Sequence, residues 1–231
     1  MRLHWFDGFT TLALVTFGGT AAGQTTLTVR TCDYAGIPAA EWQAASTLAR
    51  DVLLKAAIPT EWVLTTPDKL TARPVGDGDV FINLVPHSME GGYTASALGH
   101  TLLPGNGRQA SQIYIFHERI VDSAHDRRID PARLLGYAMA HELGHALLGT
   151  GQHSQTGVMR ERWTRADFDE IATGRLEFTA RQAGKLAAAL TARMAAAADA
   201  TGGAGASKGT SGARPAAAIA APSARAGSGY R

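Results

Sequence analysis

The spacing of apolar residues divides the first half of the chain into several short strand-like segments and one helical segment. Alternation with a period of two, or a short buried run rich in β-branched residues, is typical of strands. Strands are predicted at residues 25–30, 61–65, 79–85 and 112–117, with an irregular edge strand at 93–103. A helix should begin at Ile37-Pro38 and end by Ile58-Pro59, with Trp42, Leu48, Val52 and Leu53 among its apolar residues.

The second half of the chain is predominantly helical. Helices are predicted at residues 120–125, 131–148, 164–173 and 179–198. The segment 131–148 is mostly apolar, as expected of a buried helix. Asp130 is a suitable N-cap for it, Pro131 suits the first helical position, and Gly149 supplies a natural stop.

One face of this helix consists of small residues. Gly136, Ala140 and Gly144 fall four apart, so they lie along the same side. Glycine inside a helix costs about 1 kcal/mol relative to alanine, and its use here needs a structural reason. We expect this face to let a neighbouring strand approach closely.

The same helix carries two histidines four residues apart, His141 and His145. Side chains at this spacing project from one face, and two neutral imidazoles can share one Zn²⁺ at about 2.0–2.1 Å each. Glu142 lies about 100° around the helix from His141, where it can act on a metal-bound water instead of coordinating. The alternative is a solvated helix with two incidental histidines, and the apolar flanks count against it.

A catalytic zinc needs three protein ligands and one open position. His153 is the leading third ligand, because four residues of up to about 3.3 Å each, after a reversal at residues 149–151, can return its side chain to the metal. The alternatives are a carboxylate from a following helix, although most such groups are solvated, and a third position that is filled by water or absent. The available carboxylates are Asp167, Asp169, Glu170 and Glu177.

The run from His141 to Met159 resembles the motif of the metzincin clan of zinc peptidases, His-Glu-x-x-His-x-x-Gly-x-x-His followed by a methionine turn. Its first five residues match outright. Gly149 comes one residue later than the glycine of the motif, and His153 comes two residues later than its third histidine. Gly157-Val158-Met159 matches the turn. The chain also resembles small secreted metzincin-like proteins of bacteria that have a similar His-Ser-x-x-Gly-aliphatic-Met run.

This resemblance implies an α+β, zincin-like fold. In it a mixed, twisted sheet packs on a long N-terminal helix and on the zinc-binding helix, and C-terminal helices follow the methionine turn. Glu142 would be the general base for a zinc-activated water, Met159 would form a hydrophobic floor, and an extended peptide would pair with the edge strand at 93–103. The implied zinc ligands are His141, His145 and His153.

Further residues are candidates for lesser roles. Arg160, Arg162 and Trp163 follow the turn and are candidates to line the pocket for the substrate residue after the scissile bond. His117, at the end of a strand that leads to the site, is a candidate for transition-state stabilisation or for supporting a ligand. The remaining histidines considered, His87, His100 and His125, are interpreted as surface or satisfied polar groups.

The two ends of the chain differ from its centre. Residues 1–23 contain a charged start, an apolar run of about 14 residues and a small-residue end, which is typical of a secretory signal peptide. This run is shorter than the ~20 residues of a membrane span. Residues 199–231 are rich in Ala, Gly, Ser and Pro, which predicts a disordered tail. The peptidase domain is expected at 24–198, in a mature chain that is secreted or periplasmic and has no membrane span.

Charge and cysteine content restrict the partners. The chain is +2 overall, but the tail contributes +3 and the first 23 residues nothing, which leaves −1 on residues 24–198. Such a domain has no electrostatic footprint for nucleic acid. Cys32 is the single cysteine, so no internal disulfide forms. It is expected to be a half-buried strand residue, with a thiolate that blocks the zinc or an intermolecular disulfide as alternatives.

The primary hypothesis is a secreted zinc-dependent endopeptidase, a monomer that acts on peptides or proteins. Two other classes fit the same motif. One is a zinc-bearing binding module without activity, and the other is a zinc amidase that acts on cell-wall peptides. The intact general base, Glu142, favours an enzyme.

Overall fold

The computed structural model describes residues 26–65, 78–87, 97–104, 109 and 111–203. The strands are β1 (Leu27–Asp33), β2 (Thr60–Thr65), β3 (Val80–Val85), β4 (Gly99–Thr101) and β5 (Gln112–Phe116). The helices are α1 (Ala39–Lys55), α2 (His117–Arg127), α3 (Pro131–Leu148), α4 (Arg165–Thr173) and α5 (Ala180–Gly203). The strands form one sheet in the order β2-β1-β3-β5-β4, in which the described strands are parallel except for β4.

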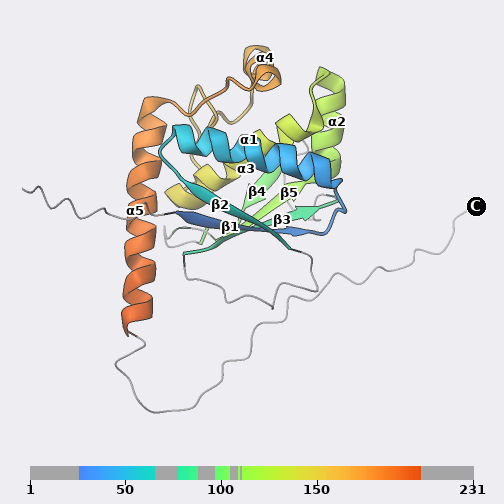
Figure 1. Ribbon diagram of the computed structural model, residues 1–231. Coiled ribbons are helices and arrows are strands. Elements are labelled where there is room, and N and C mark those ends of the chain that lie inside the picture. The colour runs from blue at the N-terminus through green and yellow to red at the C-terminus, as the bar shows by residue number, and fades with distance from the viewer. Residues whose placement is uncertain (1–25, 66–77, 88–96, 105–108, 110, 204–231) are drawn as a thin grey trace, which may run out of the picture.

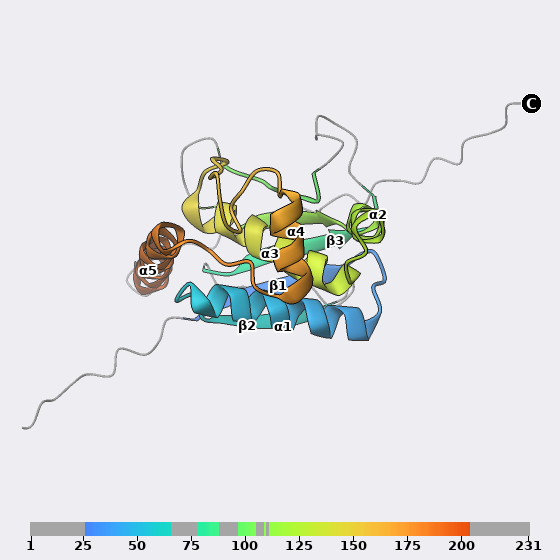
Figure 2. The ribbon, with the colours of Figure 1, turned by 90° about the horizontal axis from the view of Figure 1, so that it is seen from above.

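Helices α1 and α3 lie side by side on one face of this sheet (Figures 1 and 2). α5 stands at one end of the helical layer and α2 at the other, and α4 lies on the side of α3 away from the sheet (Figure 1). The core fills the space between sheet and helices, and its fully buried members include Val29, Ile82, Leu84, Ile113, Leu53, Leu135 and Met139. The predicted mixed sheet packed on a long N-terminal helix and on the histidine-bearing helix is therefore confirmed.

Helix α3 begins and ends where the sequence predicts. The Asp130 side chain accepts a hydrogen bond from the Ala132 N–H at 2.9 Å, and Pro131 occupies the first turn. Gly149 ends the helix with φ 63°, a left-handed conformation that glycine adopts without strain. These local signals explain why this element is predicted to the residue.

Other boundaries differ from the prediction. Within the described part of the predicted edge strand at 93–103, the strand β4 has three residues, and residues 93–96 lie outside the described ranges. β5 ends at Phe116 and α2 begins at the next residue, three positions before the predicted start at residue 120, because strand and helix follow each other without a loop. α5 continues to Gly203, beyond residue 198, the expected end of the domain.

The small-residue face of α3 packs against helix α1 and against Met159. A β-carbon on Gly136 would lie 2.8 Å from Ala45 O of α1, and one on Gly144 would lie 2.3 Å from Met159 Sδ. The expected strand contact is therefore wrong at these two glycines. The absence of a β-carbon allows any group to approach, and α1, which packs along α3, occupies the position at Gly136.

Cys32 lies in β1, as expected, but it is buried at 2% exposure and not half-buried. Among the described residues it belongs to no group of potential metal ligands.

The predicted signal peptide and the tail beyond Gly203 lie outside the described ranges. No helix that the structure describes has the length and apolar character needed to cross a bilayer.

Candidate metal centre

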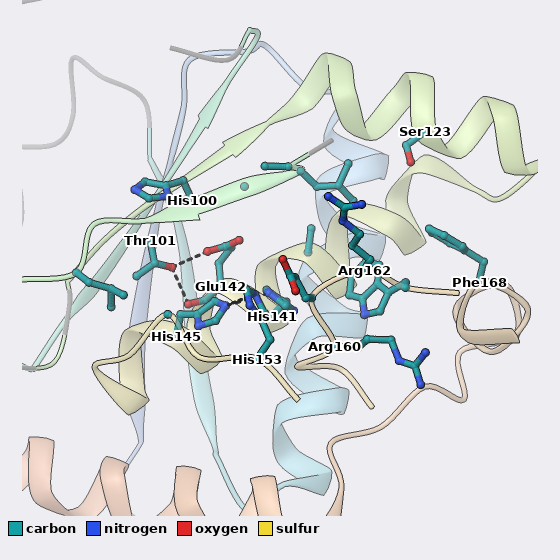
Figure 3. Close-up of a pocket in the computed structure, with 18 of the residues that line it drawn as sticks. His100, Thr101, Ser123, His141, Glu142, His145, His153, Arg160, Arg162 and Phe168 are labelled. Carbon is teal, nitrogen blue, oxygen red and sulfur yellow. Dashed lines mark hydrogen bonds between the residues drawn. The ribbon is translucent and has the colours of Figure 1, made fainter. Parts of the chain in front are cut away.

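Three histidine side chains converge at the C-terminal half of α3 (Figure 3). His141 and His145 come from successive turns of the helix, and His153 comes from the loop that follows it. The reversal at Gly149 brings this loop back towards the helix. One ring nitrogen from each of the three lies within 4.8 Å of the others. The three predicted ligands are thus together in the fold.

Backbone carbonyls determine the tautomers of two of these rings. His141 Nδ1 lies 2.8 Å from Val158 O, and His145 Nδ1 lies 2.8 Å from Thr150 O. A carbonyl can only accept a hydrogen bond, so each Nδ1 carries the hydrogen and each Nε2 of the neutral ring keeps a lone pair. The two Nε2 atoms lie 3.0 Å apart. Lone pairs that face each other at this distance repel unless a cation lies between them.

At neutral pH the cation between the two Nε2 atoms is not a proton. Burial, with a further contribution from the neighbouring His145, lowers the pKa of His141 to about 3. Burial also lowers the pKa of His145 to about 4, although its hydrogen bond to Thr150 O opposes the shift. Both rings are therefore neutral near pH 7, which is the form that binds metal ions.

The distances fit a tetrahedral metal ion. Nitrogens about 2.0–2.1 Å from a tetrahedral zinc lie about 3.3–3.4 Å from one another. His145 Nε2 lies 3.0 Å from His141 Nε2 and 3.2 Å from His153 Nε2. Three imidazoles leave a fourth position open, as catalytic zinc sites do.

The carboxylates considered as alternative ligands lie elsewhere. Asp167 caps the N-terminus of α4, and Glu177 forms an ion pair with a lysine of α1 at 2.7 Å. Asp169 and Glu170 are exposed on α4. None of the four belongs to the group of potential ligands among the described residues, which His153 completes.

The Glu142 carboxylate is buried and faces the edge strand. Thr101 Oγ1 of β4 donates to Glu142 Oε2 at 2.6 Å and lies 3.0 Å from Glu142 O (Figure 3). A β-carbon on Gly99 would lie 2.9 Å from Glu142 Cγ, so glycine in β4 makes room for this side chain. Burial raises the pKa of Glu142 to about 7, and the hydrogen bond from Thr101 opposes the rise. A carboxyl group in this range can both accept and return a proton near neutral pH.

The loop after His153 is held against the helices. The Ser154 N–H donates to Met159 O at 2.9 Å. Gln182 Nε2 of α5 donates to Ser154 Oγ at 2.6 Å and to Thr156 O at 2.9 Å. Met159 is 2% exposed, and its sulfur lies against α3 at Gly144. α5 therefore stabilises the loop that carries the third histidine.

Trp163 is connected to the histidine cluster through one carbonyl. Its Nε1 donates to Val158 O at 3.2 Å, the same oxygen that accepts from His141 Nδ1. The Trp163 ring meets the His141 ring edge-on, with centroids 5.9 Å apart, and it meets the rings of Tyr137 and Phe168 in the same manner. These contacts hold the His141 ring from outside the cluster.

A cavity of about 610 Å³ lies beside the three histidines. His100 and Thr101 line one side of it, and Arg160, Arg162 and Phe168 lie on the other side (Figure 3). Trp163 also lines the cavity. The three residues proposed from the sequence to line a pocket, Arg160, Arg162 and Trp163, thus all line this cavity.

Sequence reasoning does not single out Thr101, and it interprets His100 as a surface or satisfied polar group, whereas both residues line the cavity. His100 lines the cavity, and burial lowers its pKa. His117, the candidate for a second role, bonds instead to Glu41 of α1 at 2.8 Å and does not line the cavity. The signal for Thr101 and His100 is their place in the predicted edge strand, since an edge strand above a cleft brings its side chains to the site.

The fold that these elements form, with its histidines on the second long helix, is zincin-like. Among solved structures, 19 chains match it. One is archaemetzincin from Methanopyrus kandleri, with a TM-score of 0.51 and 15% sequence identity, covering 74% of this chain and 99% of that chain. No protein-family model and no curated protein matches the sequence. At this identity the similarity shows the fold, and conclusions about the chemistry depend on the geometry of the site.

Proposed function

We propose that this protein is a secreted zinc-dependent endopeptidase. The observation that carries the proposal is the convergence of the Nε2 lone pairs of His141 and His145. His153 Nε2 lies 3.2 Å from His145 Nε2. Backbone carbonyls place the ring hydrogens on the opposite side of the first two rings. The zincin-like fold and the adjacent buried Glu142 support the proposal, and the name archaemetzincin agrees with the resemblance of the motif.

The residues of the site have distinct roles in this proposal. His141, His145 and His153 would hold the zinc. The bound zinc supplies Lewis-acid chemistry, since it polarises a peptide carbonyl and acidifies a water molecule. Glu142 would accept a proton from the attacking water at its carboxylate and deliver it to the leaving amine. The hydrogen bond from Thr101 Oγ1 to Glu142 Oε2 fixes the orientation of this carboxylate.

The substrate in this proposal is an extended peptide that lies along β4. β4 is at the edge of the described sheet and pairs with β5 along one side. Main-chain pairing to such an edge requires little side-chain specificity. The signal-like composition of residues 1–23 supports action outside the cytoplasm.

The test is hydrolysis of unfolded proteins and of a peptide library by the zinc-loaded protein. Glu142→Ala should reduce cleavage by about 10²–10⁴-fold, while zinc content stays at that of the wild type. Glu61→Ala, at an exposed position of β2, is the matched control and should cleave normally. Full activity in Glu142→Ala would refute the proposal.

The same experiment separates the other two classes. Zinc bound to a folded protein that cleaves no peptide would indicate a binding module. Cleavage of cell-wall peptides, with unfolded proteins left intact, would indicate an amidase that uses the same residues.

A further inference from the structure

Three guanidinium groups line the cavity beside the histidine cluster, and they come from two parts of the chain. Arg127 lies in the last turn of α2, and Arg160 and Arg162 lie in the loop that leads to α4. The carboxylates that line the same cavity are Glu142, which is buried against β4, and the exposed Glu161. Cations therefore predominate on the wall formed by α2 and the loop.

Contacts with Ser123 and Phe168 restrict the orientation of the exposed Arg127 side chain. Its Nη1 donates to Ser123 Oγ at 2.9 Å and to Ser123 O at 3.1 Å. Its guanidinium carbon lies 4.3 Å from the centroid of the Phe168 ring. A guanidinium has five N–H donors, so donors remain for a ligand. Since the group is already ordered, it loses little conformational freedom when a ligand binds.

The other two arginines differ from each other. Arg160 Nε lies 3.3 Å from Asp167 Oδ2, so its charge is largely compensated. Arg162 forms no ion pair with any described residue, and neither does Arg127. Glu161 likewise lies beyond ion-pair distance of the neighbouring arginines. Two cations without a carboxylate partner in the described part of the chain thus border the cavity.

We propose that Arg127 and Arg162 bind a carboxylate of the substrate on the side of the scissile bond that faces Trp163. This inference rests on the proposed function and adds a substrate class to it, namely peptides with an acidic side chain or a free α-carboxylate at this place. Guanidinium and carboxylate groups match in geometry and form charge-assisted hydrogen bonds. In Figure 3, Arg162 lies on the same side of the histidines as Phe168.

The contacts between rings indicate how far from the scissile bond this carboxylate lies. The Trp163 ring lies 5.9 Å from the His141 ring and 6.2 Å from the Phe168 ring, on which Arg127 stacks. An extended peptide advances about 3.3–3.6 Å per residue. The Phe168 ring thus lies at most about 12 Å from the His141 ring, a span of between three and four extended residues, and we place the carboxylate within the first three residues on that side of the scissile bond.

The test uses the zinc-loaded full-length protein and peptides that carry Glu, Gln or Lys at each of these three positions. At the best position, kcat/KM for Glu should exceed that for Gln by about tenfold, because a charged hydrogen bond replaces a neutral one. Arg127→Gln and Arg162→Gln should each bring this ratio towards 1. Arg50→Gln, at an exposed position of α1, is the control and should keep the wild-type ratio.

Two further peptides identify the source of the carboxylate. One has an amidated C-terminus, and the other is extended by several residues. A preference that disappears on amidation assigns the site to a chain-terminal carboxylate, whereas a preference that survives both changes assigns it to an acidic side chain.

The inference and the proposed function fail in different ways. Cleavage with a Glu-to-Gln ratio near 1, or a preference unchanged in both arginine variants, overturns the inference and leaves the peptidase intact. If no peptide is cleaved, the proposed function fails, and binding of labelled Glu and Gln peptides to Glu142→Ala decides the inference. Tighter binding of the Glu peptide that is lost on adding Arg162→Gln supports the carboxylate site, and equal binding of the two peptides overturns it.

Discussion

Gly144 and Met159 are in contact at the helical position immediately before His145. A β-carbon added to Gly144 would lie 2.3 Å from Met159 Sδ and 3.1 Å from Met159 Cε. Glycine at this helical position costs about 1 kcal/mol relative to alanine. In return, the methionine sulfur lies against the helix backbone one residue before His145, and the loop that carries His153 is held close to α3.

Replacing Gly144 by alanine should therefore destabilise the protein although alanine is the better helix former. Displacement of a buried side chain costs about 1–3 kcal/mol, against a gain in helix propensity of about 1 kcal/mol, and we expect a net loss of up to about 2 kcal/mol. Urea unfolding of the metal-free protein measures it. Gly184 of α5 is the matched control, because a β-carbon there meets nothing within 4 Å. Gly184→Ala should stabilise by about 0.5–1 kcal/mol, and equal effects of both substitutions would contradict the role of Met159.

The bond between Thr101 and Glu142 gives a second prediction, which concerns catalysis by the proposed peptidase. Thr101→Val keeps the shape of the side chain but removes the donor to Glu142 Oε2. Because the carboxylate is then no longer oriented, kcat should fall about tenfold, with KM and zinc content near those of the wild type. Thr101→Ser retains the hydroxyl and should recover most of the activity. A fall in zinc content parallel to kcat would show instead that Thr101 supports the fold of the site.

The histidine-bearing helix could be predicted to the residue because its signals are local. Asp130, Pro131 and Gly149 mark its ends, and the spacing of His141 and His145 follows from the helical period alone. Such features depend on residues within a few positions of one another. The class of fold is implied by the resemblance of the motif, and the predicted order of the elements agrees with it.

The partners of that helix could not be predicted in the same way. Thr101 meets Glu142 across 41 positions of sequence, and Gly136 meets the backbone of α1 at Ala45. A glycine indicates that something approaches closely, but it does not specify whether a strand, a helix or a methionine does so. β4 has three residues, and it is a strand because it pairs with β5, so its own sequence carries little signal. Tertiary contact decides each of these features.

Arg193 connects α5 to the start of β3, and its removal should be costly. Its Nε donates to Gly78 O at 2.8 Å and its Nη2 to Asp79 O at 2.9 Å, and the residue is 7% exposed. Arg193→Met would leave two carbonyls without these donors, at a cost of about 2–4 kcal/mol. Thermal unfolding checks this expectation. Arg181→Met, at an exposed position of the same helix, should change stability by less than about 0.5 kcal/mol. Similar effects of the two substitutions would contradict a specific role for Arg193.

The last prediction concerns the third ligand. His153→Ala should lower zinc affinity by more than about 100-fold, because groups that merely orient a ligand already contribute 10–100-fold. Elemental analysis and competition with a chelator measure this, with His125→Ala as the control, since His125 is an exposed residue of α2 outside the cluster. We expect about one zinc per chain in the wild type and in the control.

The zinc content of His153→Ala and of the wild type also tests which groups complete the site and whether the peptidase proposal stands. His153 Nε2 lies 3.2 Å from His145 Nε2, in a loop that Gln182 of α5 holds in place, and the group of potential ligands among the described residues contains no carboxylate. Zinc retained at full affinity in the variant would therefore mean that a group outside the three histidines completes the site. Zinc absent from folded wild-type protein would remove the basis of the peptidase proposal, because the facing lone pairs of His141 and His145 would then need another cation.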